Sequence, residues 1–366
     1  MRLTRGLAAF FPVCLFLSGC GAAPVPPVQT VTSVIPSSTG TPNSIASLGN
    51  FEFVSVQGTG QIFTYDISSG SQVAVGAPYS TPCVDPSAML ITSIAGSNIM
   101  AVVCYDTGSL LTLTIGASGS LTPLGSVSGL AAPYPGAVLD GTNVLVPLFG
   151  QSAAANGGVA RVSIASPAKP VITGTATLAS PASGEFANPA YLAVDSGYIY
   201  LAAGSESGPL GASSTIQVVD ESTMTLVGTP LTVAHSPQQI AVQGSAIYVT
   251  FFDAMQLESI DISIPASLQP LQILSLAQAN SSCNALSIAI RNNAAYVGCY
   301  PQGTIEQFDI TAPASMKLTQ TLTNITEPQR LLFAQNYLFA TSSSVGGSVY
   351  QIPLSTSSIG GTISTP

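Results

Sequence analysis

One histidine and a small set of acidic side chains are the residues in this chain that could do chemistry. His235 is the only histidine, and a lone histidine can act as a general base or a metal ligand. A Ser-His-Asp triad needs serine and carboxylate partners arranged around that histidine. Ser236 follows directly, but adjacency in sequence does not create attack geometry. We therefore interpret His235 as a solvated loop residue and assign no catalytic residue.

Six carboxylates and one arginine form the candidate ligand or cation site. They map to loops that we expect to share one face of the fold, the face on which the first strand of each repeat begins. The set is Asp85, Asp106, Glu185, Glu206, Asp253 and Glu327, with Arg330 as the nearby cation. Clustered oxygen ligands can hold Ca²⁺ or attract a cationic ligand. We assign no cofactor, and Ca²⁺ is the one candidate cofactor that we leave open. The alternative is that sparse charges collect in loops because strands exclude them.

The charge balance excludes a nucleic-acid partner. The 366 residues include 7 basic and 16 acidic side chains, whereas a nucleic-acid binder needs a basic face. Charged residues make up 6% and hydrophobic residues 46% of the chain, which excludes a charge-rich disordered protein. The sequence contains no phosphate loop, metal triad or nucleotide fingerprint.

A long repeat must position the candidate residues. A proline followed by an apolar stretch recurs, with one asparagine in the series: Pro42, Pro86, Pro135, Pro189, Pro237, Asn284 and Pro328. A turn and a second apolar strand follow each of them, then a third strand and a weaker fourth. Repeated four-stranded units are typical of β-propellers. We therefore expect an all-β propeller of seven four-stranded antiparallel blades over residues 41–366.

The third strand ends in aspartate in several repeats. The residues are Asp66, Asp220, Asp261 and Asp309. Aspartate accepts hydrogen bonds from the backbone of the residues that follow it, so we interpret these residues as caps of the next turn. To close the ring, we expect residues 31–35 to add to the sheet of the seventh blade as a strap. Residues 360–365 are expected to supply its outer strand.

Cysteine positions agree with this register. Cys83 and Cys283 lie beside inner-strand starts, and Cys104 and Cys299 end the second strands of the same blades. Those two points lie close together on one face of a propeller blade. We predict disulfides Cys83–Cys104 and Cys283–Cys299, each stabilising the fold by about 3 kcal/mol. Such disulfides form in the oxidising compartments that exported proteins enter.

The N-terminal residues indicate export and anchoring. An apolar run over residues 7–17 is too short for a helix to span a bilayer core of about 30 Å. The segment Leu17-Ser18-Gly19-Cys20 resembles the lipobox of bacterial lipoproteins. The resemblance implies a signal peptide over residues 1–20 and lipidation of Cys20 with diacylglycerol and a further acyl chain such as palmitate. Gly21 favours outer-membrane sorting in a Gram-negative cell. Residues 21–40 are expected to form a Pro/Ser/Thr-rich tether.

One repeat carries a more specific resemblance. Residues 223–250 contain the segments Ser-Pro-Gln-Gln-Ile-Ala-Val and Ile-Tyr-Val-Thr, and they resemble the YVTN-type repeat of bacterial β-propellers. The resemblance supports the fold but does not specify a function, because propellers host many functions.

Three functions stay open. We favour a membrane-anchored module of the cell envelope that binds an envelope protein or a glycan, or acts as a scaffold, through its loop face. The second is a propeller hydrolase of lactone type with a divalent cation at the channel mouth. The third is a structural surface protein. The sequence favours a protein that is not an enzyme.

Overall fold

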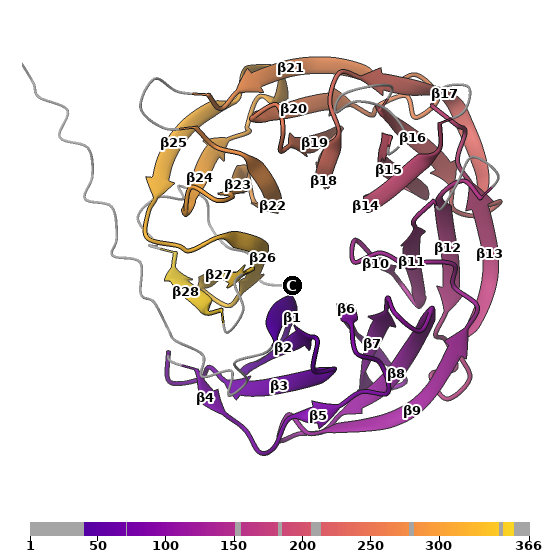
Figure 1. Ribbon diagram of the computed structural model, residues 1–366, viewed down its shortest axis with the longest axis vertical. Helices are drawn as coiled ribbons and strands as arrows, with labels where there is room; N and C mark the ends of the chain where they lie inside the picture. The colour runs from indigo at the N-terminus through magenta and orange to yellow at the C-terminus, as the bar shows by residue number, and fades with distance from the viewer. Residues whose placement is uncertain are drawn as a thin grey trace, which may run out of the picture.

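The computed structural model describes residues 40–70, 72–150, 155–181, 185–205, 214–277, 282–343 and 347–354. Seven antiparallel sheets stand around a central channel, so the seven-bladed propeller is confirmed (Figure 1). Each sheet is one blade, and its first strand lies innermost. The strap at residues 31–35 and the outer strand at residues 360–365 lie outside the described residues, as do the signal peptide and most of the tether.

The first four blades contain β1 to β17. Blade 1 has β1 (Thr41–Leu48), β2 (Phe51–Gln57), β3 (Gln61–Asp66), β4 (Val73–Ala74) and β5 (Tyr79–Ser80). Blade 2 has β6 (Pro86–Ile94), β7 (Ser97–Cys104), β8 (Ser109–Ile115) and β9 (Leu121–Ser128). Blade 3 has β10 (Val138–Asp140), β11 (Asn143–Leu148), β12 (Gly158–Ser163) and β13 (Val171–Thr177). Blade 4 has β14 (Ala187–Asp195), β15 (Tyr198–Ser205), β16 (Ser214–Asp220) and β17 (Thr225–Val233).

The last three blades complete the ring. Blade 5 has β18 (Pro237–Gln243), β19 (Ala246–Phe251), β20 (Gln256–Asp261) and β21 (Gln269–Ser275). Blade 6 has β22 (Ala285–Arg291), β23 (Ala294–Cys299), β24 (Thr304–Asp309), the short 3₁₀ helix η1 (Pro313–Ser315) and β25 (Lys317–Leu322). Blade 7 has β26 (Pro328–Ala334), β27 (Tyr337–Ser342) and β28 (Val349–Pro353). No helix among the described residues is long and apolar enough to cross a bilayer.

The hydrophobic core lies between blades. Buried apolar side chains form one cluster at each seam between neighbouring blades, because both faces of every middle strand are covered. The ring closes where Val54 and Phe63 of blade 1 pack with Phe339 and Val349 of blade 7. The chain enters the ring at Gly40, which packs against Val56 and Thr59 beside the end of β2.

The aspartates that end the third strands cap the turns that follow, as predicted. The backbone N–H of Ser68 donates to Asp66 Oδ1 at 2.8 Å, and that of Ser263 donates to Asp261 Oδ1 at 2.8 Å. The other two members of the set, Asp220 and Asp309, accept equivalent bonds from Thr223 at 2.9 Å and Thr311 at 2.9 Å. Hydrogen bonds from the turn lower the pKa of Asp66, because they stabilise the charged form.

These turns lock neighbouring blades together. At Gly228 in β17, a β-carbon would collide with the carbonyl oxygen of Ala266 in the turn of blade 5. At Gly125 in β9 it would lie 2.6 Å from the carbonyl oxygen of Ala168 in the turn of blade 3. The Ser259 hydroxyl donates to the carbonyl oxygen of Pro313 in the turn of blade 6 at 2.7 Å. Each of these turns therefore fits a notch in the preceding blade.

Three glutamates are buried in the second and third strands. Burial raises the pKa of Glu52 to about 8 and that of Glu258 to about 7, and it also raises the pKa of Glu306. The Gln72 amide donates to Glu52 Oε2, but Glu52 Oε1 is buried without a hydrogen-bond partner. An ionised carboxylate is costly in such surroundings, which explains why burial raises the pKa of each of the three groups.

The notch at Gly228 gives the first prediction. Gly228→Ala should lower the free energy of unfolding by about 3 kcal/mol, because the new methyl group meets the carbonyl oxygen of Ala266 and the residue keeps a positive φ. Gly244 is the matched control: it also has a positive φ (59°), but nothing lies within 4 Å of its would-be β-carbon. Gly244→Ala should cost about 1 kcal/mol. Equal losses in urea denaturation would contradict the interlock.

Glu52 gives a pH prediction. Its folded-state pKa of about 8 lies above the ordinary value of 4.5, so the folded protein holds this proton more tightly than the unfolded chain. Stability from this group is fully present below the ordinary value and is lost as pH rises toward 8. The melting temperature of Glu52→Gln should fall less over that pH window than that of the wild type. Glu258→Gln should remove a smaller part of the slope, and an unchanged slope in Glu52→Gln would refute the assignment.

Candidate functional site

The loop face is the side of the ring that holds the connections between blades and the turns between second and third strands. Asp85 precedes β6, Glu185 precedes β14 and Glu327 precedes β26, while Asp106 follows β7 and Asp253 follows β19. Each described acid of the predicted set therefore lies on this face. Glu206 lies outside the described residues.

Arg330 crosses the central channel. The register of β26 shifts between Pro328 and Arg330, and the Arg330 guanidinium carbon lies 4.9 Å from the ring centre of Tyr191. Tyr191 belongs to β14, on the opposite side of the channel from β26 (Figure 1). Arg330 Nε also donates to the carbonyl oxygen of Asn43 in blade 1 at 3.3 Å. Burial lowers the pKa of Arg330 to about 10, so the group stays charged at neutral pH.

Asp85 lies close to this arginine. Its carboxylate accepts hydrogen bonds from Asn43 Nδ2 at 2.8 Å and from Gln57 Nε2 at 3.1 Å. Burial raises the pKa of Asp85, and the Asp106 charge adds to the rise, while the two amide bonds and Arg330 oppose it. Arg330, Asn43 and Asp85 thus join blades 7, 1 and 2 around the channel mouth.

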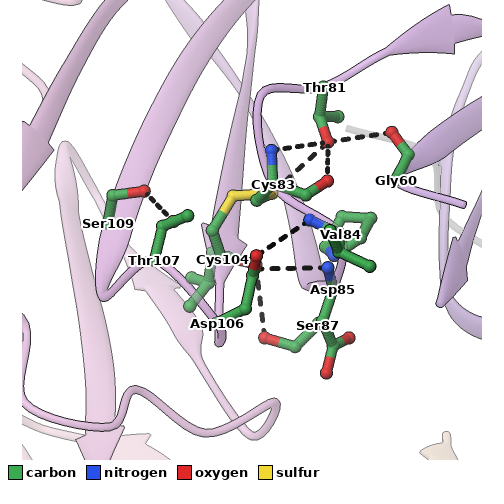
Figure 2. The surroundings of a disulfide bond; sticks show 12 residues. Gly60, Thr81, Cys83, Val84, Asp85, Ser87, Cys104, Asp106, Thr107 and Ser109 are labelled. Carbon is green, nitrogen blue, oxygen red and sulfur yellow. Dashed lines mark hydrogen bonds between the residues drawn. A yellow bond between two sulfur atoms is a disulfide. The ribbon is translucent and has the colours of Figure 1, made fainter. Parts of the chain in front are cut away.

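A disulfide and a capping aspartate hold the loop that carries Asp85. Figure 2 shows Cys83 bonded to Cys104 at the end of β7, with an S–S distance of 2.05 Å. Asp106 accepts hydrogen bonds from the backbone N–H groups of Val84 at 3.0 Å and Asp85 at 3.2 Å (Figure 2). Asp106 therefore positions Asp85 by holding its backbone.

The second disulfide has the equivalent place in blade 6. Cys283 is bonded to Cys299 with an S–S distance of 1.97 Å, so both bonds are the pairs expected from the register. The side chain of the next residue, Asn284, donates to the carbonyl oxygen of Phe252 at 3.0 Å. The one described group of three close metal-ligand atoms is Cys283, Cys299 and Glu306. Its two sulfurs already bond each other, and it contains none of the predicted acids.

Two other predicted acids, Asp253 and Glu327, contact residues away from Asp85. His235 Nδ1 lies 3.7 Å from Asp253 Oδ2 in blade 5, and Asp253 Oδ1 is buried without a hydrogen-bond partner. The described structure shows no hydrogen bond between Ser236 and His235. Glu327 Oε2 accepts a hydrogen bond from the Ser343 hydroxyl at 2.9 Å. Asp253 and Glu327 are therefore held in other blades, whereas Asp85, Asp106 and Arg330 lie together at the channel mouth.

Aromatic residues on the same face were missed in the sequence. Tyr134 lies edge-on to Tyr105 at 6.1 Å between ring centres and stacks on Phe149 at 5.0 Å; we call these three the aromatic row. Tyr105 is 42% exposed, and nearby Val84 is 56% exposed. Tyr191 was also missed, although it stands two residues after its proline, as Arg330 does.

The pair across the channel gives the third prediction. A double-mutant cycle of Arg330→Ala and Tyr191→Leu should show a coupling of about 1–2 kcal/mol in urea denaturation, because a desolvated cation over an aromatic ring is stabilising. Arg291 over Phe333, at 5.7 Å, is the matched control. That pair should show a coupling of about 0.5 kcal/mol. A coupling energy of zero between Arg330→Ala and Tyr191→Leu would show that the two side chains do not interact.

Comparisons with known proteins support the fold. No family model matches this sequence. No curated protein matches it significantly either. Similar solved structures include the Cps50 (Swd1) β-propeller domain of Myceliophteria thermophila, at 10% identity and a TM-score of 0.64 over 86% of this chain and 97% of that one. BamB from Moraxella catarrhalis shares 13% identity, with a TM-score of 0.52 over 84% of this chain and 81% of that one.

An enzyme is also among these similar structures. The Pseudomonas aeruginosa periplasmic gluconolactonase PpgL shares 12% identity, with a TM-score of 0.62 over 86% of this chain and 99% of that one. Identities this low show a common fold alone. What these comparisons establish for this chain is the β-propeller architecture.

Proposed function

We propose that this protein is a binding or scaffold module of the cell envelope that presents its loop face to an envelope protein or a glycan. The observation that carries the proposal is the bridge from Arg330 to Tyr191 across the channel. The bridge joins opposite blades through a charged side chain. The mouth is therefore built as a rigid surface.

The acids of the face support the same proposal. Asp106 holds the backbone of Val84 and Asp85, and Glu327 bonds Ser343. Their hydrogen-bonding capacity is used to shape loops. Asp85 is held by Asn43 and Gln57. Loops fixed in this way keep their shape when a partner binds, which lowers the entropic cost of binding.

The exposed side chains of the face suit a partner surface. The aromatic row and Val84 place aromatic and apolar groups beside the charged groups at the channel mouth. Tyrosine offers a large rigid contact area with a polar tip, and it is enriched at protein interfaces. Aromatic faces also stack against sugar rings, so a glycan partner is compatible with the same residues.

A lactone hydrolase is the second candidate. Its support is the acid–cation pair at the channel mouth, because burial raises the pKa of Asp85 beside the charged Arg330. PpgL shares the fold. The third candidate, a structural surface protein, rests on the low charge of the chain.

Anchoring is part of the proposal. The lipobox-like segment ending at Cys20 supports attachment to a bacterial membrane, with the outer membrane favoured by Gly21. Residues 21–40 would tether the propeller to that membrane. Cys20→Ser should move the protein from the membrane fraction to the soluble fraction. Retention of the variant in the membrane would refute the lipid anchor without bearing on the loop face.

Site-specific photo-crosslinking in the source cell gives the fifth prediction. A benzophenone amino acid at Val84 should yield one discrete adduct, which mass spectrometry identifies. Ile264 is the matched control, because it is 62% exposed against 56% for Val84 and lies in a turn on the opposite face. The same benzophenone amino acid placed at Ile264 should yield no such adduct.

Two outcomes would count against the binding module. Adducts of equal yield at both positions would indicate non-specific contacts. Turnover of gluconolactone by the purified propeller, lost in Asp85→Asn while the fold is kept, would favour the hydrolase.

A further inference from the structure

The end of the Arg330 side chain carries donors that the fold does not use. Its Nε donates to the carbonyl oxygen of Asn43, and its guanidinium lies over the ring of Tyr191. Neither Nη atom makes a hydrogen bond to any described residue, and neither is among the unpartnered side-chain atoms that are buried from solvent. Two neighbouring donor groups are therefore open to a ligand in the channel.

Arg330 also lacks an ion-pair partner. Within the described part of the chain, the one ion pair is that of His235 with Asp253 in blade 5. The charge of Asp85 acts on Arg330, but the oxygens of this carboxylate accept from the amide groups of Asn43 and Gln57. Because burial strengthens charge interactions, an anion that reaches Arg330 binds more tightly than it would at an exposed arginine.

The loop face has a single described basic residue. The other four described basic residues lie in, beside or bonded to turns of the opposite face, and they are Arg161, Lys169, Arg291 and Lys317. The whole chain has a formal net charge of −9. Arg330 is therefore the position on this face to which an anion is drawn.

The contacts of Arg330 leave one edge of the guanidinium for a ligand. Tyr191 covers the group from one side, and the hydrogen bond from Nε to Asn43 occupies a second direction. The edge formed by the two Nη atoms remains. The planar guanidinium can donate two parallel hydrogen bonds to a planar carboxylate, which gives both affinity and a fixed orientation.

The surrounding charges limit the ligand to one negative charge. Asp85 and Asp106 lie at the same mouth, and the charge of Asp106 raises the pKa of Asp85. A doubly charged anion such as phosphate would be repelled by both acids with one arginine to offset them. A neutral ligand would leave Arg330 without a counter-charge.

We propose that Arg330 binds the carboxylate of a monoanionic ligand that enters the channel from the loop face. The two Nη groups donate to the two carboxylate oxygens, while Tyr191 and Asn43 hold the guanidinium in place. The carboxylate belongs to a small organic acid or to the free C-terminus of a peptide. The inference does not rest on the partner proposed for the loop face, so crosslinking at Val84 and the titrations below can fail independently.

Titration of the purified full-length protein with matched probes tests the proposal. Acetate and benzoate should bind in calorimetry and saturation-transfer NMR, whereas acetamide and benzamide, which have the same shape without the charge, should not. Tetra-alanine with a free C-terminus is compared with the same peptide amidated at that end. Binding of the free peptide alone assigns the carboxylate to a chain end, and binding of the small acids without the peptide assigns it to a small acid.

Substitutions at Arg330 locate the site. Arg330→Lys keeps the charge but loses the paired donors, so benzoate should bind about tenfold more weakly. Arg330→Gln should weaken binding about ten- to hundredfold. Arg291→Gln is the matched control, because Arg291 also lies over an aromatic ring and donates to a backbone carbonyl oxygen, but on the opposite face. This control should leave the affinity unchanged, and circular dichroism checks the fold of each variant.

Four outcomes would overturn the proposal. They are no binding by any monocarboxylate, equal binding of benzamide and benzoate, tighter binding of phosphate or succinate than of benzoate, and unchanged affinity in folded Arg330→Gln. The comparison of benzoate with benzamide uses the wild type, so it decides the question even when Arg330→Gln does not fold.

Discussion

The fit of one blade's turn into the preceding blade is the contact on which the ring depends. Asp261 shapes the turn of blade 5 by accepting a backbone hydrogen bond, and the carbonyl oxygen of Ala266 in that turn approaches Gly228 closely. A side chain at Gly228 would hold the blades apart. Blade spacing sets the width of the channel, and that width decides whether Arg330 can reach Tyr191. The geometry of the loop face therefore depends on contacts made near the opposite face.

The parts of the fold that the sequence predicted are those that repeat. The prolines set the blade register, and the aspartates that end third strands implied a local role that needs only residues two or three positions apart. The disulfide pairing could be predicted because Cys83 and Cys104 occupy the same blade positions as Cys283 and Cys299. Residues 31–35 and 360–365, expected to close the ring, lie outside the described residues, so ring closure by these segments stays a prediction.

The candidate site was harder to predict, because it depends on distances around the ring. Arg330 and Tyr191 are far apart in sequence, and only the ring diameter makes them neighbours. Acids that share a face were expected to act together, yet two of them bond to nearby loop residues instead. Asp106 accepts from backbone N–H groups, and Glu327 accepts from the Ser343 hydroxyl. A carboxylate in a tight loop is surrounded by unpaired backbone donors, and the nearest donor is usually local.

The position of Gly40 has a consequence for how the two faces are presented. Gly40 lies beside the end of β2, on the same face of the ring as Arg330 and the aromatic row. A chain of twenty residues, residues 21–40, reaches about 60 Å when it is fully extended as polyproline II. The proposed lipid anchor, attached through such a tether, would raise the effective concentration of the loop face toward molecules in the same membrane.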